Sequence, residues 1–391
     1  GMYAVYHGGE GIRAIANQIH QKAKALAAAL TKAGHAVVHD QFFDTIRIKL
    51  NENGFNDIQR KAEKNKLNFR YFDNGDVGLS LDETVLPDDV NDILSIFEAK
   101  KIDATNEFNL KNTRSSKYLT HNVFNAYHTE TEMMRYLHRL ETKDLTLNTS
   151  MISLGSCTMK LNAAAEMMPI TWPEFAHLHP FAPSNQTQGY HELGQTLSKW
   201  LMDITGLQGC SLQPNSGAQG EYTGLLVIQA YHHDRGDTNR NICLIPASAH
   251  GTNPASAVMA GMDVVVIQCD ENGNIDVDDL KSKTKQYSES LAAIMVTYPS
   301  THGVFEESIG EVCDIVHEHG GQIYLDGANL NAMVGLARLG EFGTDVCHIN
   351  LHKTFAIPHG GGGPGMGPIC VAKHLIPYLP GHSLIENNKK A

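Results

Sequence analysis

The sequence predicts an α/β protein, in which a large domain built on a mostly parallel sheet follows a smaller α+β domain. Continuous apolar strand-like runs recur through the second part of the chain, as in sheets whose strands are buried on both faces. The first hundred residues instead mix helical patterns with short strand-like runs. A chain of 391 residues is also too long for one ordinary core.

The small domain is expected over residues 1–115. Residues 10–33 carry apolar side chains at helical spacing, and Gly34 follows as the stop. Further strands are expected at 36–38, 45–48, 67–71 and 76–82, with helices at 55–65 and 87–99. The polar stretch from Lys111 to Lys117 marks the expected boundary.

The large domain is expected over residues 116–391. Leu193, Leu197 and Leu201 lie on one face of a helix that Gly206 ends. Strand-like runs follow at 242–246, 264–269, 292–298, 322–325, 346–351 and 369–372.

Composition excludes several classes of function. The net charge of -12 disfavours nucleic-acid binding, which needs a basic surface, and no apolar run is long enough to span a bilayer. The seven cysteines are odd in number and lack a CxxC spacing, which favours free thiols in a reducing compartment. His317-Glu318-His319 lacks the spacing of a helical zinc motif and indicates a solvated helix face, so no metal site is predicted.

One candidate for chemistry is Lys353, which follows an apolar strand and precedes the glycine run 360–363. Partial desolvation at a strand end favours a neutral, nucleophilic amine, as Schiff-base chemistry requires. A solvated lysine at the end of a strand is the alternative. The glycines fit the spacing GxGxxG, but a strand follows them instead of a helix, so a nicotinamide site is not expected.

A second candidate is Asp326, at the carboxyl end of a β-rich run. Ligands bind at that edge of open α/β sheets, and a carboxylate there can keep a cofactor's pyridine nitrogen protonated. A turn or helix-capping aspartate is the alternative.

Two further segments point to ligand binding. Small residues at 213–220 open a helix, where backbone N–H groups and the helix dipole suit a phosphate monoester. His250 follows the strand 242–246, where an imidazole can stack on a flat ring or transfer a proton. Each signal alone also fits a structural role. Their joint occurrence at strand and helix ends indicates one site.

These residues resemble the P-protein family of glycine decarboxylases. The resemblance extends to the opening segment 3–8 and covers nearly the whole chain. The segments that carry it are 154–162, 212–221, 250–257, 297–303, 326–331 and 351–365.

The resemblance implies fold type I of the pyridoxal-phosphate enzymes for the large domain. It also implies that Lys353 forms the Schiff base with pyridoxal 5'-phosphate, that Asp326 faces the pyridine nitrogen and that His250 stacks on the ring. Residues implied to hold the phosphate are Ser216, Gly217 and Gln219. Thr301 and His352 are implied to line the pocket.

The activity implied is decarboxylation of glycine, with transfer of the aminomethyl group to the lipoyl arm of the partner H-protein. A homodimer is implied for the full-length protein, in the bacterial cytoplasm or the mitochondrial matrix. The chain is expected to join the end of the first homologous half to the large domain of the second, and to lack full activity alone.

Three other functions remain open from the residues. Another fold type I decarboxylase or an aminotransferase shares the same cofactor machinery, although an aminotransferase usually needs an arginine for the substrate carboxylate. Only Arg235, Arg240 and Arg338 follow residue 200, and none lies in a site motif. A non-catalytic scaffold is the alternative from a different class.

Overall fold

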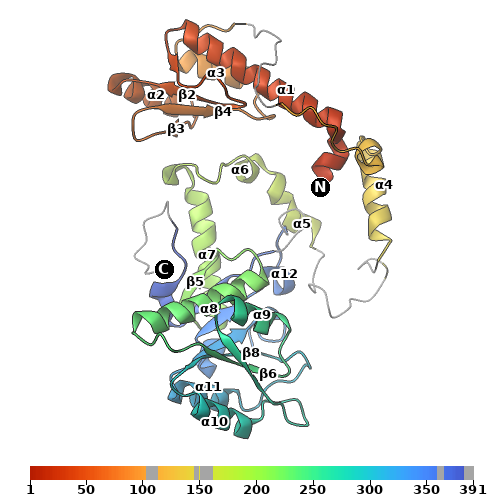
Figure 1. Ribbon diagram of the computed structural model, residues 1–391, viewed down its shortest axis with the longest axis vertical. Coiled ribbons are helices and arrows are strands. Elements are labelled where there is room, and N and C mark those ends of the chain that lie inside the picture. Colours follow the sequence, from red (N-terminus) through yellow and green to blue (C-terminus); the bar gives the residue numbers. More distant parts are fainter. Residues whose placement is uncertain (103–112, 145–148, 150–161, 359–364, 383–391) are drawn as a thin grey trace. The chain divides into compact units, whose positions relative to one another are not determined.

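The computed structural model describes residues 1–102, 113–144, 149, 162–358 and 365–382 (Figure 1). The chain forms two compact units, Gly1–Thr149 and Ser150–Ala391. Residues beyond 115 belong to the first unit because they make hydrogen bonds with its first helix. The Tyr118 hydroxyl donates to the Gly9 carbonyl at 2.7 Å, and the His128 ring bonds the Tyr6 carbonyl at 2.7 Å. The division between compact units therefore falls beyond the predicted boundary near residue 115, while the assignment of the units to two homologous halves stays a prediction.

Three of the four described helices of the first unit were predicted, and the fourth was not. They are α1 (Met2–Lys32), α2 (Glu52–Lys64), α3 (Pro87–Ile96) and α4 (Glu130–Glu141), with a 3-10 turn η1 (Asn122–Asn125). Gly8 interrupts α1 with non-helical φ and ψ of 62° and -178°, which is why the regular apolar pattern starts only after it. At the other end, Gly34 adopts φ of 95°, a left-handed conformation that stops the helix.

A four-stranded antiparallel sheet packs against α1, α2 and α3. Its order is β1-β2-β4-β3, and the strands are β1 (Ala36–Val37), β2 (Thr45–Lys49), β3 (Arg70–Tyr71) and β4 (Val77–Ser80). Leu26 and Leu30 of α1 are fully buried in one cluster with Ile46 and Ile48 of β2. The predicted α+β unit is confirmed.

The second unit is built on a seven-stranded sheet of order β5-β11-β10-β9-β8-β6-β7. Its strands are β5 (Gly209–Ser211), β6 (Ile242–Pro246), β7 (Asp263–Ile267), β8 (Leu291–Thr297), β9 (Gln322–Asp326), β10 (Val346–His348) and β11 (Ile369–Val371). Of these, β11 alone runs antiparallel to its neighbours β5 and β10. The predicted mostly parallel sheet is confirmed, and only the three-residue β5 was not predicted.

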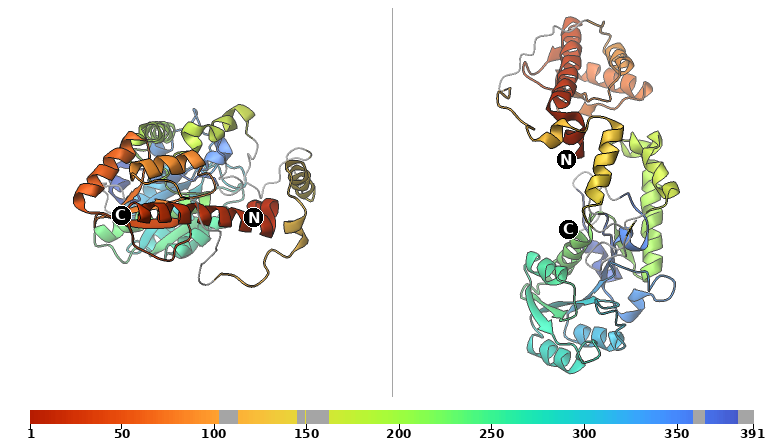
Figure 2. Two further views of the ribbon diagram at one scale, coloured as in Figure 1. Left: turned by 90° about the horizontal axis from the view of Figure 1, so that it is seen from above. Right: turned by 90° about the vertical axis from the view of Figure 1, so that its right-hand side faces the viewer.

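Helices cover both faces of this sheet, as Figures 1 and 2 show. Buried side chains of α8 (Gly217–Asp234) and α9 (Thr252–Met259) pack on one face. Those of α7 (Gln188–Thr205), α10 (Val277–Gln286) and α11 (Ile309–Glu318) pack on the other. The remaining helices and 3-10 turns are α5 (Ala164–Met167), η2 (Met168–Thr171), α6 (Pro173–Ala176), η3 (Ser184–Gln186), η4 (Leu339–Phe342), α12 (Leu351–Thr354) and η6 (Lys373–Tyr378). Among the described residues, no helix has the length and apolar character needed to cross a membrane.

Free thiols are confirmed for the six cysteines that the structure describes. Cys243, Cys313, Cys347 and Cys370 are buried, and Cys210 and Cys269 are half-buried. Cys157, most of the segment 154–162 and the glycine run 360–363 lie outside the described residues.

Candidate functional site

The site residues lie at one edge of the large sheet, where four parallel strands end. In the register of the sheet, Thr297 of β8 lies beside Asp326 of β9, which lies beside His348 of β10. The loop after β6 brings His250 to the same edge, directly before α9. The position predicted for Asp326, at the carboxyl end of a buried strand, is confirmed.

Three nitrogen atoms surround the carboxylate of Asp326, which is only 6% exposed. Its Oδ1 accepts the Ala328 backbone N–H at 3.0 Å and lies 3.4 Å from Nε2 of His348. Its Oδ2 accepts from Nδ2 of Asn253 at 3.2 Å. Polar contacts from three directions thus offset the cost of burying these oxygens.

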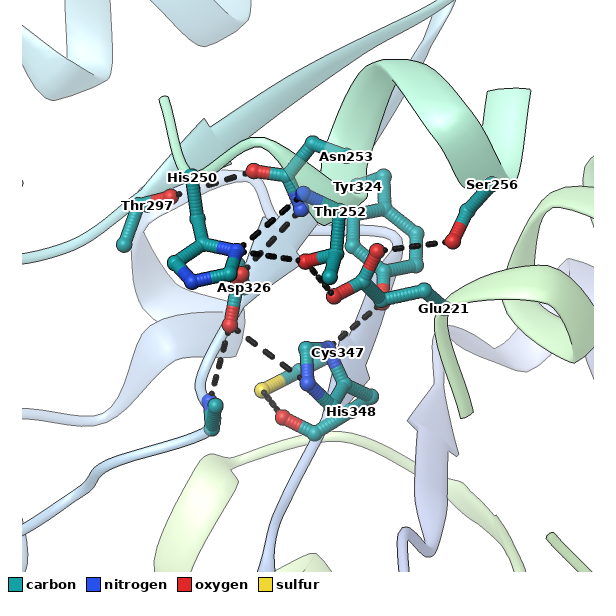
Figure 3. A network of polar contacts seen from close by, with 11 residues as sticks. Glu221, His250, Thr252, Asn253, Ser256, Thr297, Tyr324, Asp326, Cys347 and His348 are labelled. Atoms are coloured by element: carbon teal, nitrogen blue, oxygen red, sulfur yellow. Dashed lines mark hydrogen bonds and ion pairs between the residues drawn. The ribbon is translucent and has the colours of Figure 1, made fainter. Parts of the chain in front are cut away.

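His250 belongs to a second part of the same network (Figure 3). Its Nδ1 lies 2.7 Å from Oγ1 of Thr252, and that hydroxyl donates to Oε1 of Glu221 at 2.8 Å. Ser256 donates to the other Glu221 oxygen at 2.8 Å. Glu221 on α8 is only 4% exposed. Its buried carboxylate holds the Thr252 hydroxyl, and Thr252 in turn orients the His250 ring.

The start of α8 has the properties of an anion site. Ser216 caps the helix, and its hydroxyl accepts the Gln219 backbone N–H at 3.2 Å. The Gln219 side chain turns back and accepts the Asn215 N–H at 3.0 Å, which shapes the preceding loop. The first N–H groups of an 18-residue helix lack intrahelical partners and lie at the positive end of its dipole.

Glycines let α8 approach the sheet closely. A Cβ on Gly220 would lie 2.6 Å from the Gly367 carbonyl oxygen, and one on Gly224 would lie 2.6 Å from the ring of Tyr324. No side chain fits in either space. The start of α8 is therefore held directly against the strand ends.

Lys353 lies on α12, the short helix that follows β10, and is half-buried. Asn350, directly before this helix, places its side-chain amide against the α carbon of Gly217: a Cβ there would lie 2.5 Å from Oδ1. The same Oδ1 is buried and has no hydrogen-bond partner among the described residues. The element that carries the lysine thus contacts the start of α8.

The other two predicted residues border the same edge. The Thr301 hydroxyl donates to the Ser248 carbonyl in the loop that leads to His250. His352 is buried on α12, where the α carbon of Gly365 packs against its ring. The structure thus brings the eight predicted residues to the ends of neighbouring strands and helices, while the roles assigned to them stay predictions.

Several polar residues of the network had no role in the sequence prediction: Glu221, Thr252, Asn253, Thr297, Tyr324, His348 and Asn350. Four of them had a signal, since Thr297, Tyr324, His348 and Asn350 are polar residues inside or directly after an apolar run. Glu221, Thr252 and Asn253 carry no such signal. His348, for example, stands between Cys347 and Ile349 in a buried strand.

The described arginines of the second unit lie away from the site residues. Arg240 donates to the carbonyls of Leu291 and His319, at the opposite edge of the sheet where β8 begins. Arg235 pairs with Asp237, and Arg338 with Glu341. None therefore stands near Asp326 to bind a substrate carboxylate.

The mixed seven-stranded sheet with helices on both faces gives the second unit the predicted fold, that of the large domain in fold type I pyridoxal-phosphate enzymes. A crystal structure titled glycine decarboxylase (P-protein) of the glycine cleavage system shares this fold, with a TM-score of 0.53 and 18% identity. The similarity covers 65% of this chain and 55% of that one. Residues 1–97 and 101–389 match the family model of the glycine cleavage system P-protein, and the chain belongs to that family.

Curated relatives agree with this assignment. Glycine dehydrogenase (decarboxylating) of Nostoc sp. is 59% identical over 99% of the chain, and that of Deinococcus radiodurans is 58% identical over 98%. The mitochondrial protein of Dictyostelium discoideum is 52% identical over 98% of the chain. The chain spans 40–41% of the length of these relatives.

Proposed function

We propose that this chain supplies the pyridoxal-phosphate site of a glycine decarboxylase, which transfers the aminomethyl group of glycine to the lipoyl arm of an H-protein. The observation that carries the proposal is the meeting of three elements at one sheet edge. These are the buried Asp326 carboxylate, the start of α8, and the segment from Asn350 into the helix of Lys353. Membership of the P-protein family supports glycine as the substrate and H-protein as the partner.

The donor set at this edge fits pyridoxal 5'-phosphate. The start of α8, with Ser216, Gly217 and Gln219, would hold the phosphate through the positive end of the helix dipole and the N–H groups of its first turn that the Ser216 cap leaves free. Beside it, the buried Oδ1 of Asn350 packs against the α carbon of Gly217 and has no partner among the described residues, so it could accept a hydrogen bond from a donor group of the cofactor. At the other end of the edge, Asp326 would pair with the protonated pyridine nitrogen.

The remaining residues have distinct tasks. Lys353 would supply the amine that anchors the cofactor, and His250 would stack on the ring in the orientation that Thr252 imposes. Thr301 and His352 would line the pocket and exclude water from it. When bound, the cofactor supplies an electron sink for the bond to the departing carboxylate.

Asp326 would contribute through its position. Contacts with Ala328, Asn253 and His348 hold the carboxylate in place, where it would face the ring nitrogen. Lys353 would hold the cofactor through its amine, and as a free amine it could accept or return a proton. The lipoyl disulfide of H-protein is the oxidant, because it takes up the electron pair left when carbon dioxide departs.

The assembly and its compartment belong to the same proposal. The relatives include bacterial proteins and a mitochondrial one, so the bacterial cytoplasm or the mitochondrial matrix is the expected location. A homodimer is expected for the full-length protein. An aminotransferase finds less support, because the arginines of the described second unit lie away from the site.

An absorbance titration tests the proposal. Pyridoxal phosphate added to the chain should produce a protein-bound band near the visible range, which Lys353→Ala removes. Lys285→Ala, on the exposed face of α10, is the matched control and should retain the band. A parent chain without the band would contradict cofactor binding by this chain. With the band established, exchange of labelled bicarbonate into glycine, dependent on lipoylated H-protein, tests the reaction.

A further inference from the structure

Three buried polar side chains line up beneath the start of α8. Tyr324 and Asp326 lie two residues apart on β9 and share one face of the sheet. His348 lies beside Asp326 on β10 and shares that face. Their exposed fractions are 0% for Tyr324, 1% for His348 and 6% for Asp326. Each must find hydrogen-bond partners inside the protein, because burial without them is costly.

The Tyr324 hydroxyl lies 2.5 Å from Nδ1 of His348, and the Nε2 of the same ring lies 3.4 Å from Oδ1 of Asp326. Burial raises the pKa of Tyr324 well above its usual value, and the carboxylates of Asp326 and Glu221 raise it further. The hydroxyl therefore keeps its proton and can donate a hydrogen bond to Nδ1. A neutral imidazole that accepts at Nδ1 carries its proton on Nε2, where it faces Asp326.

The packing of α8 keeps this chain of groups in place. The bare α carbon of Gly224 lies against the ring of Tyr324, and that of Gly220 lies against Cβ of His348. The Tyr324 ring and the base of the His348 side chain are thus tightly packed. The two side chains therefore present fixed donors along the edge of the sheet.

A bound cation is the other explanation for this cluster. Glu221, Asp326 and His348 offer ligand atoms within 4.8 Å of one another. Yet Thr252 and Ser256 already donate to both Glu221 oxygens, and Asn253 and Ala328 donate to both Asp326 oxygens. The described partners of these oxygens are donors, which favours a hydrogen-bonded network over a metal site.

We propose that Tyr324 holds His348 as the neutral Nε2–H tautomer, and that His348 thereby positions the Asp326 carboxylate for the pyridine nitrogen. His348 and Tyr324 are positioning residues, since both act through Asp326. The proposal deepens the function proposed above and rests on its assignment of Asp326 to the cofactor ring.

Nitrogen NMR of the unloaded chain, labelled with 15N-histidine, tests the tautomer directly. The signal that His348→Leu removes should show a protonated Nε2 and an unprotonated Nδ1. Tyr324→Phe should shift this signal toward a mixture of tautomers. A protonated Nδ1, or a signal that Tyr324→Phe leaves unchanged, would overturn the proposal. If a stoichiometric amount of zinc ions shifts this signal, the proposal is also overturned, because the cluster would then bind a cation.

Binding of two cofactors tests the consequence for Asp326. The parent should bind pyridoxal phosphate more tightly than the analogue that carries a C–H group in place of the ring nitrogen. His348→Leu should reduce this preference about tenfold and Tyr324→Phe about threefold, since a hydrogen bond to a charged group is lost or weakened. His348→Gln should restore part of the preference, because its amide N–H can reach toward Asp326.

The matched control is His232→Gln, which replaces another buried imidazole of this unit. His232 is 1% exposed and bonds the Ala292 carbonyl at 3.0 Å, away from Asp326. A purely structural role for His348 predicts equal loss of affinity for both cofactors, and that result would overturn the proposal. A parent that binds neither cofactor would contradict the proposed function for this chain, while the imidazole signals would still decide the tautomer.

Discussion

A Cβ atom on Gly217 would lie 2.5 Å from Oδ1 of Asn350, so the start of α8 and the segment that leads into α12 are in direct contact. This contact joins two sequence motifs that are more than a hundred residues apart. One motif offers backbone N–H groups to a phosphate, and the other carries Lys353. A small change at Gly217 should therefore disturb cofactor binding at both motifs.

Gly217→Ala tests this contact. The added methyl group must displace the Asn350 amide, which we expect to weaken pyridoxal-phosphate binding at least tenfold and to cost about 1–3 kcal/mol of unfolding free energy. Gly189→Ala is the control, since Gly189 lies near the start of α7 with open space around it. Titration of the bound-cofactor absorbance and denaturant unfolding measure the two effects. Equal affinity in the two variants would disprove the contact.

The hydroxyl of Thr252 should matter for His250, and that of Ser256 should not. Both donate to Glu221 at 2.8 Å, but only Thr252 also contacts the His250 ring. Thr252→Val and Ser256→Ala should each cost about 1–3 kcal/mol of unfolding free energy, because a buried carboxylate loses a donor. Cofactor affinity should fall about tenfold in Thr252→Val alone. The same loss in Ser256→Ala would show that Glu221 acts through packing and not through His250.

Local sequence patterns were enough to predict the strands and the motifs at their ends. The runs that became β6, β8, β9 and β10 are apolar because both faces of each strand are buried. Ligand-binding residues follow such strands because the carboxyl ends of parallel strands meet at one edge. Asp326 and His250 could thus be predicted from one stretch of sequence each. The strand β5 is too short, at three residues, to produce a pattern.

The partners of these residues could not be predicted in the same way. Glu221 meets Thr252 only because α8 and α9 pack on the same face of the sheet, and Tyr324 meets His348 only because β9 and β10 are neighbours. Periodicity identifies a strand but not the strand that lies beside it. The resemblance to a family indicated which residues form the site, and the structure adds the side chains that hold them.

Buried thiols should react slowly with alkylating agents. Burial raises the pKa of Cys243 and of Cys313 to about 12, so the thiolate fraction at pH 8 is on the order of 10⁻⁴. Iodoacetamide at pH 8 should therefore modify the half-buried Cys269 well before either, as peptide mass spectrometry can follow. Unfolding in guanidinium should make all three equally reactive. Prompt modification of Cys243 in the folded chain would contradict its buried position in β6.

An ion pair between His317 and Asp345 should make stability depend on pH. His317 Nε2 lies 2.7 Å from Oδ2 of Asp345, and this hydrogen bond raises the pKa of His317 above its usual 6.5. A raised folded-state pKa stabilises the protein fully below the unfolded value and loses that effect as the pH rises through the folded value. His374 also faces Asp345, at 3.7 Å, but burial lowers its pKa, so it adds less charge in this range.

His317→Asn should therefore reduce the free energy of unfolding more at pH 5.5 than at pH 8.5. The difference should be below about 1 kcal/mol, because the His317 side chain is 35% exposed and solvent screens the pair. Urea unfolding at the two pH values measures it. The matched control is His319→Asn, which removes a nearby imidazole that bonds the Ile315 carbonyl and not Asp345. A larger loss at pH 8.5 would mean that His317 stabilises the fold as a neutral ring, through its hydrogen bond alone.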